Sequence, residues 1–292
     1  MKTYLDCLPC FVRQALDAVR LVTDEPGVQE QVLRQVLAEL GRIDLGWKPP
    51  QMGQKIHRLV REVVGVKDPY RKVKRRFNDA ALKIYSRMRQ LVIESEDPLE
   101  AAIRLAIAGN IIDFGVNGAL QESDLEQTIS ECLDADFTEV QLEDFRNAVN
   151  EAEDILYLAD NAGEIIFDRL LIEQLPIEKI TVAVKGSPVI NDATMEDAIL
   201  AGLPKIVEVI DNGSDAPGTI LESCSQSFRD RFEKADLIIA KGQGNYETLN
   251  DADKNIFFIL KAKCPVIARD ISCATGAALL FRKRPVAVMG NL

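Results

Sequence analysis

Two adjacent polar residues, Asp160 and Asn161, are well suited to bind a metal ion in this 292-residue chain. A carboxylate and a side-chain carbonyl offer hard oxygen ligands of the kind that bind Mg²⁺ or Mn²⁺. Gly163 allows the backbone to turn tightly into a following helix, whose amino terminus can receive phosphate oxygens. The same residues could instead form a turn that caps this helix, and the segment alone favours neither interpretation.

Two later segments contain polar residues that could complete a site for a phosphate ester. In the first, Lys185 could neutralise a phosphoryl oxygen and Asp192 could close the metal shell, although Asp192 could also cap the next predicted helix. In the second, residues 241–247, a glycine-containing loop with Lys241 and Asn245 could hold a sugar or a phosphate. This loop lacks the spacing of a Walker phosphate loop, and no Rossmann glycine pattern follows the first predicted strand. ATP hydrolysis and nicotinamide chemistry therefore lose support.

Short apolar runs of strand length recur through the carboxyl-terminal half of the chain. We predict strands at 155–159, 180–184, 206–210, 237–240, 256–260 and 265–268, with a further one at 286–289. Helical segments such as 164–175 separate several of them. Continuous apolar strands that alternate with helices are typical of a parallel sheet covered on both faces. We therefore predict an α/β fold with a doubly wound, largely parallel sheet in a three-layer sandwich.

The first 150 residues show helical periodicity. Apolar residues recur at helical intervals in segments 31–40, 99–107, 125–133 and 142–149. We predict that residues 1–150 form a helical region, as a cap or a flank, and that residues 151–292 form the metal- and phosphate-binding domain. Asn110 and Asp113 would share a helix face, from which they could orient substrate. Capping and core hydrogen bonds would explain these two residues equally well.

Polar residues follow the ends of five predicted strands. They are Asp160, Lys185, Asp211, Lys241 and Lys261. Because ligands bind beyond the carboxyl ends of parallel strands, these residues should converge on one edge of the sheet. A single strand-end Asp is often only a helix cap, whereas five polar strand ends together favour a site.

The composition limits the partners and the chemistry. A formal net charge of −11 disfavours nucleic acid, and the basic run at 71–76 is better explained as a solvated helix face, although a small anionic substrate could lie along one edge of it. No long apolar run and no apolar amino-terminal segment occur, which predicts a cytoplasmic protein without a membrane span. The single histidine, His57, argues against a His-rich zinc centre and a Ser-His-Asp mechanism. The oligomeric state is left open.

Cys7 and Cys10 form a Cys-x-x-Cys motif near the amino terminus. Two thiolates at this spacing can supply half of a tetrahedral zinc or iron site, to which Cys264 or Cys273 could contribute. Redox pairing and simple burial on an amphipathic helix are the alternatives.

Several motifs together resemble the damage-control phosphatase family, formerly called domain of unknown function 89. They are Asp-Asn-Ala-Gly-Glu at 160–164, Lys-Gly-x-Pro-x-x-Asn-Asp at 185–192, Lys-Gly-x-Gly-Asn-Tyr at 241–246 and Gly-Asn-Ile-Ile-Asp-Phe at 109–114. The Cys-x-x-Cys pair resembles one branch of that family. The resemblance implies hydrolysis of phosphate esters with Mn²⁺, Ni²⁺, Co²⁺ or Mg²⁺ as cofactor. It implies that Asp160, Asn161 and Asp192 are the metal ligands and the catalytic centre.

The resemblance also implies substrate contacts from the loop with Asn245 and from Lys261. The sugar-phosphate branch of the family has Arg-Thr-x-Lys where this chain has Phe-Ile-Leu-Lys at 258–261. This difference puts sugar phosphates in doubt, and the resemblance to the Cys-x-x-Cys branch implies damaged or surplus purine nucleotides or their precursors as the better candidates. Asp160 or a water activated by the metal could attack phosphorus, and water is favoured because a metal ligand is a poorer nucleophile. The alternative functions are a carboxyl methyltransferase that uses S-adenosylmethionine and a non-catalytic metal- or nucleotide-binding regulator.

Overall fold

Six strands form one sheet in the computed structural model, which describes residues 1–111 and 139–283. They are β1 Ile155–Leu158, β2 Ile180–Val184, β3 Glu208–Asp211, β4 Leu237–Lys241, β5 Ile256–Lys261 and β6 Ala278–Lys283. Their order is β3-β2-β1-β4-β5-β6, with β1 to β5 parallel and β6 antiparallel to β5. The strand order reverses between β1 and β4, and such a point leaves a crevice at the carboxyl ends of the two strands.

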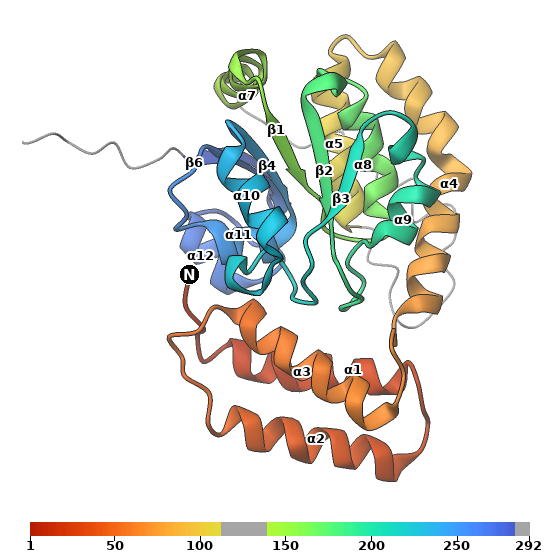
Figure 1. Ribbon diagram of the computed structural model, residues 1–292, viewed down its shortest axis with the longest axis vertical. Helices are drawn as coiled ribbons and strands as arrows, with labels where there is room; N and C mark the ends of the chain where they lie inside the picture. Colours follow the sequence, from red (N-terminus) through yellow and green to blue (C-terminus); the bar gives the residue numbers. More distant parts are fainter. Residues whose placement is uncertain (112–138, 284–292) are drawn as a thin grey trace, which may run out of the picture.

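Helices cover both faces of this sheet, so that the domain has three layers (Figure 1). The bounds are α1 Cys7–Arg20, α2 Pro26–Leu40, α3 Pro49–Val64, α4 Arg71–Glu94, α5 Pro98–Ile111, α7 Glu139–Glu151, α8 Glu164–Ile172, α9 Met195–Leu200, α10 Gln226–Lys234, α11 Gly242–Leu249 and α12 Pro265–Ile271, with 3₁₀ turns η1 Ile177–Lys179, η2 Leu203–Lys205 and η3 Leu221–Ser223. In β1, Ile155 and Tyr157 face the core that includes α4, α5, α7 and α8. Leu156 and Leu158 face the core that includes α10 and α12. This alternation explains why every position of β1 is apolar.

The helices of the first 150 residues divide between two cores. Helices α1, α2 and α3 pack on one another around Phe11, Val36 and Ile56. Figure 1 shows these three helices below the edge at which β1 and β2 end. Helices α4 and α5 instead join the core on one face of the sheet. The domain boundary near residue 150 stays a prediction.

One predicted strand is wrong. The sequence predicts a strand at 265–268, but Pro265–Ile271 forms helix α12. Pro265 occupies the first helical turn, where its fixed φ is favourable, and a short apolar run does not distinguish a buried helix from a strand. The antiparallel strand β6 is missing from the sequence prediction, and the predicted segments 125–133 and 286–289 lie outside the described residues. None of the helices in the described part of the chain is both long and apolar enough to cross a membrane.

Candidate metal and phosphate site

The loops that follow β1 and β2 meet at the carboxyl edge of the sheet. Asn161 and Asp192 form an isolated antiparallel bridge. The backbone N–H of Ala193 donates to the carbonyl oxygen of Asp160 at 2.7 Å. These contacts bring together the three residues predicted as metal ligands, which come from two different βα junctions.

The two acidic residues of this group are buried. Burial, together with the charges of Glu164 and Asp192, raises the pKa of Asp160 well above its ordinary value. Burial also raises the pKa of Asp192, to about 6, although Lys185 opposes this shift. Neighbouring buried carboxylates are costly to ionise unless a cation compensates them.

A divalent cation fits this site only if the side-chain oxygens of Asn161 and Asp192 are not already used in hydrogen bonds. The Nδ2 of Asn161 donates to Asp160 Oδ2 at 2.6 Å and to Glu164 Oε2 at 3.0 Å, while its Oδ1 accepts no hydrogen bond from a described residue. The Oδ2 of Asp192 is buried and accepts no hydrogen bond of good geometry from the described residues, although Lys185 Nζ lies 3.4 Å away as an ion-pair partner. Such oxygens suit a hard divalent cation. Within the described ranges, no group of three or more His, Cys, Asp or Glu side chains is arranged to hold a metal ion. The donor set proposed here is of a different kind, because it combines two carboxylates with the amide oxygen of Asn161.

Lys185 lies beside Asp192 in a strained loop. The Nζ of this buried lysine is 3.4 Å from Asp192 Oδ2 and donates to the carbonyl oxygen of Gly218. Within the loop, Ile190 has a φ of 45°, which is unfavourable for a β-branched residue. Arg61 of α3 donates to the carbonyl oxygen of Pro188 at 2.9 Å. Helix α3 therefore helps to hold the loop that presents Asp192, a contribution that the sequence analysis misses.

Lys241, a predicted substrate-binding residue, is completely buried beneath the carboxylates. Its Nζ donates to Glu164 Oε1 at 2.7 Å, to Asp168 Oδ1 and to the carbonyl oxygen of Ala106 at 3.0 Å. Although burial lowers the pKa of Lys241, the carboxylates of Asp168 and Glu164 raise it above its ordinary value. The lysine stays charged, and its position favours holding Glu164 in place over contact with substrate.

Asn245, another predicted substrate-binding residue, joins two of the loops. Its side chain is fully buried, with Oδ1 accepting from Thr219 Oγ1 at 2.7 Å and Nδ2 donating to the carbonyl oxygen of Lys241 at 2.8 Å. Both ends of the amide are therefore used within the protein. Asn245 ties the segment after β3 to the first turn of α11.

One lysine ends β5 and a second follows it two residues later. The predicted residue Lys261 is half-buried, and Lys263 is exposed. Lys263 acts to lower the pKa of Asp160, although burial outweighs it. The sequence analysis misses Lys263. The feature that could have identified it is its spacing of two residues from Lys261, because alternate residues of an extended chain point to the same side.

Helix α4 reaches the site through Lys74, which belongs to the basic run 71–76, and through Asn78, which the sequence analysis misses. Asn78 Oδ1 accepts the backbone N–H of Gly163 at 2.7 Å, and Asn78 Nδ2 donates to Asp197 Oδ1 at 2.7 Å. Lys74 Nζ lies 2.8 Å from Asp197 Oδ2. The spacing of four residues places Lys74 and Asn78 on one helix face, which is the sequence signal for their shared role.

The sequence also predicts four further site residues, Asn110, Asp113, Cys7 and Cys10. Asn110 lies in α5 and its side chain is not described, and Asp113 lies outside the described residues. Cys7 and Cys10 occupy the first turn of α1. Burial raises the pKa of both thiols, and Cys264 lies near enough to contribute to both shifts. Metal binding, redox pairing and simple burial stay predictions for this motif.

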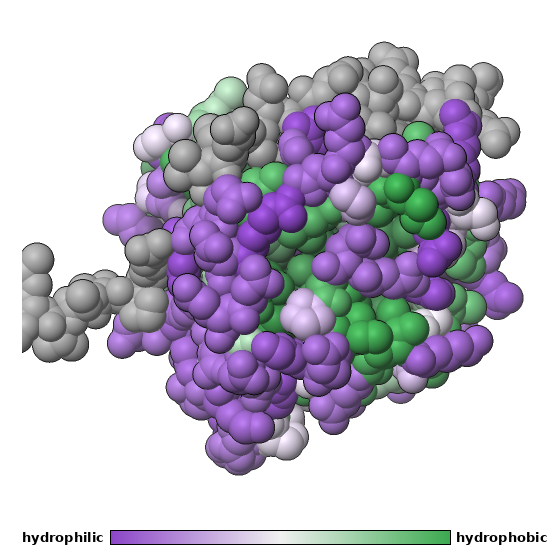
Figure 2. Space-filling model, turned by 90° about the horizontal axis from the view of Figure 1, so that it is seen from above, coloured by the Kyte–Doolittle hydropathy of each residue, from purple (hydrophilic) through white to green (hydrophobic). Residues whose placement is uncertain are grey.

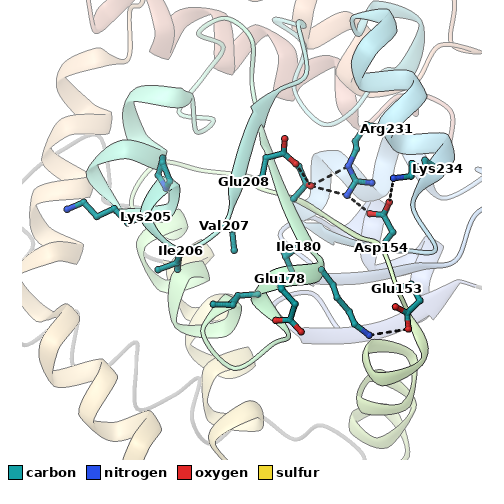
Figure 3. A pocket seen from close by; sticks show the side chains of 14 residues that line it. Glu153, Asp154, Glu178, Ile180, Lys205, Ile206, Val207, Glu208, Arg231 and Lys234 are labelled. Atoms are coloured by element: carbon teal, nitrogen blue, oxygen red, sulfur yellow. Dashed lines mark hydrogen bonds and ion pairs between the residues drawn. The ribbon is translucent and has the colours of Figure 1, made fainter.

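A separate hollow of about 570 Å³ lies at the opposite edge of the sheet, where β1, β2 and β3 begin (Figure 3). Asp154 pairs there with Arg231 and with Lys234, the latter at 3.2 Å, and Thr181 donates to Glu208 at 2.9 Å. Figure 2, turned to view the molecule from above, shows apolar surface among polar side chains. The hollow holds none of the residues predicted to do chemistry.

Comparisons relate the chain to known proteins along most of its length. The family model described as the damage-control phosphatase ARMT1-like domain matches residues 3–279. A damage-control phosphatase of Archaeoglobus fulgidus is 37% identical over 92% of this chain and 95% of the relative. The damage-control phosphatase PH1575 of Pyrococcus horikoshii is 35% identical over 97% of this chain and 99% of the relative. The crystal structure of PH1575, a DUF89 family protein, matches with a TM-score of 0.89 and 34% identity, covering 97% of this chain and 100% of that one.

Proposed function

Because this chain belongs to the family of the damage-control phosphatase ARMT1-like domain, we propose that it is a metal-dependent phosphatase of small phosphate esters. Its substrates would be damaged or surplus metabolites, such as purine nucleotides or their precursors. The observation that carries the proposal is that Asp160, Asn161 and Asp192 lie together near the carboxyl end of β1, where the strand order reverses between β1 and β4.

The oxygens of these three side chains would hold a divalent cation, with Mn²⁺, Ni²⁺, Co²⁺ and Mg²⁺ as the candidates. When bound, the cation would polarise the phosphate and stabilise the negative charge that develops during transfer. Support comes from the buried carboxylates of Asp160 and Asp192, whose raised pKa values show the cost of ionising them without a cation.

The surrounding residues would position the reacting groups. Lys241 holds Glu164, which accepts from Asn161 Nδ2 and so turns the amide oxygen of Asn161 away from Glu164. Lys185, Lys261 and Lys263 would neutralise phosphate oxygens. Water would attack phosphorus in preference to Asp160, because a carboxylate that holds a cation is a poor nucleophile.

A screen of the wild-type protein with p-nitrophenyl phosphate and nucleotide phosphates tests the function. Each of the four metals is added in turn, and we expect turnover that a chelator abolishes. Asp160→Ala should lower kcat by at least about 100-fold, since it removes a ligand and a charge at the centre of the site. The matched control is Asp253→Ala, an exposed aspartate that precedes β5 and should leave turnover unchanged.

Two results would contradict this proposal. Turnover near the wild-type level in Asp160→Ala would remove Asp160 from the centre of the site. An absence of turnover with every metal and every ester would favour a binding protein over an enzyme.

A further inference from the structure

A hollow of about 390 Å³ lies between α4 and α9, which run side by side in Figure 1. We call it the α4–α9 hollow, and besides Ile199 and Leu200 its lining has Asn78, three basic side chains (Arg71, Lys74 and Arg75) and three acidic ones (Asp68, Glu196 and Asp197). Two of these residues connect it to the candidate site. Asn78 accepts the backbone N–H of Gly163, two residues after Asn161, and Lys74 is close enough to Asp192 to lower its pKa against the effect of burial.

The positive charges of the hollow are unequally neutralised. The buried Lys74 lies between Asp197, at 2.8 Å, and Asp68, at 4.0 Å. Arg71 approaches Glu196 only at 3.8 Å, with 72% of its own side chain exposed, and an exposed pair of this kind is weak. Arg75 makes no ion pair or hydrogen bond with any residue in the described ranges. Arg71 and Arg75 are therefore available to bind an anionic group.

The α9 side of the hollow carries two exposed aliphatic side chains next to the carboxylates of Glu196 and Asp197. Ile199 is 60% exposed and Leu200 is 44% exposed, although both are large aliphatic residues. These two side chains favour a ligand with an apolar or aromatic body, because contact removes apolar surface of both partners from water. Guanidinium groups beside them favour a phosphate, which arginine binds through paired hydrogen bonds.

We propose that the α4–α9 hollow binds the part of the substrate that is not hydrolysed, and that it selects phosphate esters with an apolar body and a second anionic group. This inference rests on the proposed phosphatase function. One phosphate would occupy the site formed by Asp160, Asn161 and Asp192. The second anionic group would lie against Arg71 and Arg75, with the apolar body against Ile199 and Leu200.

The test compares three esters with the metal-loaded full-length protein. Adenosine 3′,5′-bisphosphate has two phosphates, whereas adenosine 5′-monophosphate and p-nitrophenyl phosphate have one each. We expect Arg75→Ala to lower kcat/KM for the bisphosphate about tenfold, mainly through KM, and to change the values for both monophosphates less than about twofold. The matched control is Lys72→Ala, which removes an exposed charge of α4 outside the lining.

A second variant separates the contribution of the aliphatic side chains from that of the charge. Ile199→Ser should raise KM for both adenosine esters about equally. Equal effects of Arg75→Ala on all three esters, or no effect on any of them, would overturn this inference. In either case, turnover of p-nitrophenyl phosphate by the wild-type protein would still support the proposed phosphatase function. A wild-type protein that hydrolysed none of the esters would overturn both.

Discussion

The carboxylate of Asp160 lies against the α-carbon of Gly242. A Cβ atom built at residue 242 would stand 1.9 Å from Asp160 Oδ2, and the φ of Gly242 is 79°. The contact arises because β1 and β4 are neighbours in the sheet, so that the residues following them start from the same edge. A side chain at residue 242 is therefore incompatible with the observed position of Asp160.

Gly242→Ala should displace Asp160 and lower kcat/KM for p-nitrophenyl phosphate by about 100-fold, since small displacements of catalytic groups are costly. Gly65→Ala is the matched control, because Gly65 has a φ of 68° and nothing within 4 Å of a built Cβ. In both variants the left-handed backbone conformation of the new alanine should lower the free energy of unfolding, measured in urea, by about 1–2 kcal/mol. Equal activity in the two variants would show that the contact does not position Asp160.

Lys241→Met should destabilise the protein by about 3–5 kcal/mol, because it leaves Glu164 and Asp168 without their buried cation. The free energy of unfolding in urea is the measurement. Adding Asp168→Asn to this variant should restore part of the loss, since one of the two uncompensated charges is removed. A double variant as unstable as the sum of the two single variants would indicate that the pair is not coupled.

Lys263→Met should raise KM for a phosphate ester about fivefold, because Lys263 is a positive charge that acts on Asp160 across the site. Lys261→Met gives the comparison within the same segment, and we expect its effect to be smaller. Lys254→Met serves as the control, since Lys254 pairs with Glu233 before β5 begins. A larger effect at Lys261 would assign the phosphate contact to that residue.

Asp215 should make the docking of α3 sensitive to acid. Although burial raises the pKa of Asp215, hydrogen bonds from Arg58 and Gln54 hold it at about 2. A carboxyl group whose pKa is lowered in the folded state stabilises the protein above its unfolded pKa of about 4, and this stabilisation is lost as the pH falls towards 2. Wild type should exceed Asp215→Asn in free energy of unfolding by about 1 kcal/mol at pH 6, after allowance for solvent screening. A difference that persisted undiminished near pH 2 would contradict this account.

The architecture could be predicted because its signals are local. Apolar runs of four or five residues that alternate with helices indicate a parallel sheet, and the structure confirms the α/β fold with β1 to β5 parallel. The rule that ligands bind at carboxyl strand ends selected Asp160, Lys185 and Lys241, which follow or end β1, β2 and β4. The exception, Pro265–Ile271, is a segment whose short apolar run suits a helix or a strand.

The depth and the partners of each side chain depend on contacts between distant segments. Lys241 and Asn245 carry the residue types of a substrate-binding loop, yet both are buried and bonded within the protein. Asn78 joins the site from a helix 85 residues before Gly163. The sequence by itself determined which polar groups stand at the strand ends, because strand periodicity depends only on neighbouring residues. The tertiary structure alone decided which of their atoms remain free to bind a ligand, because that depends on the packing of α3, α4 and α11 around the loops.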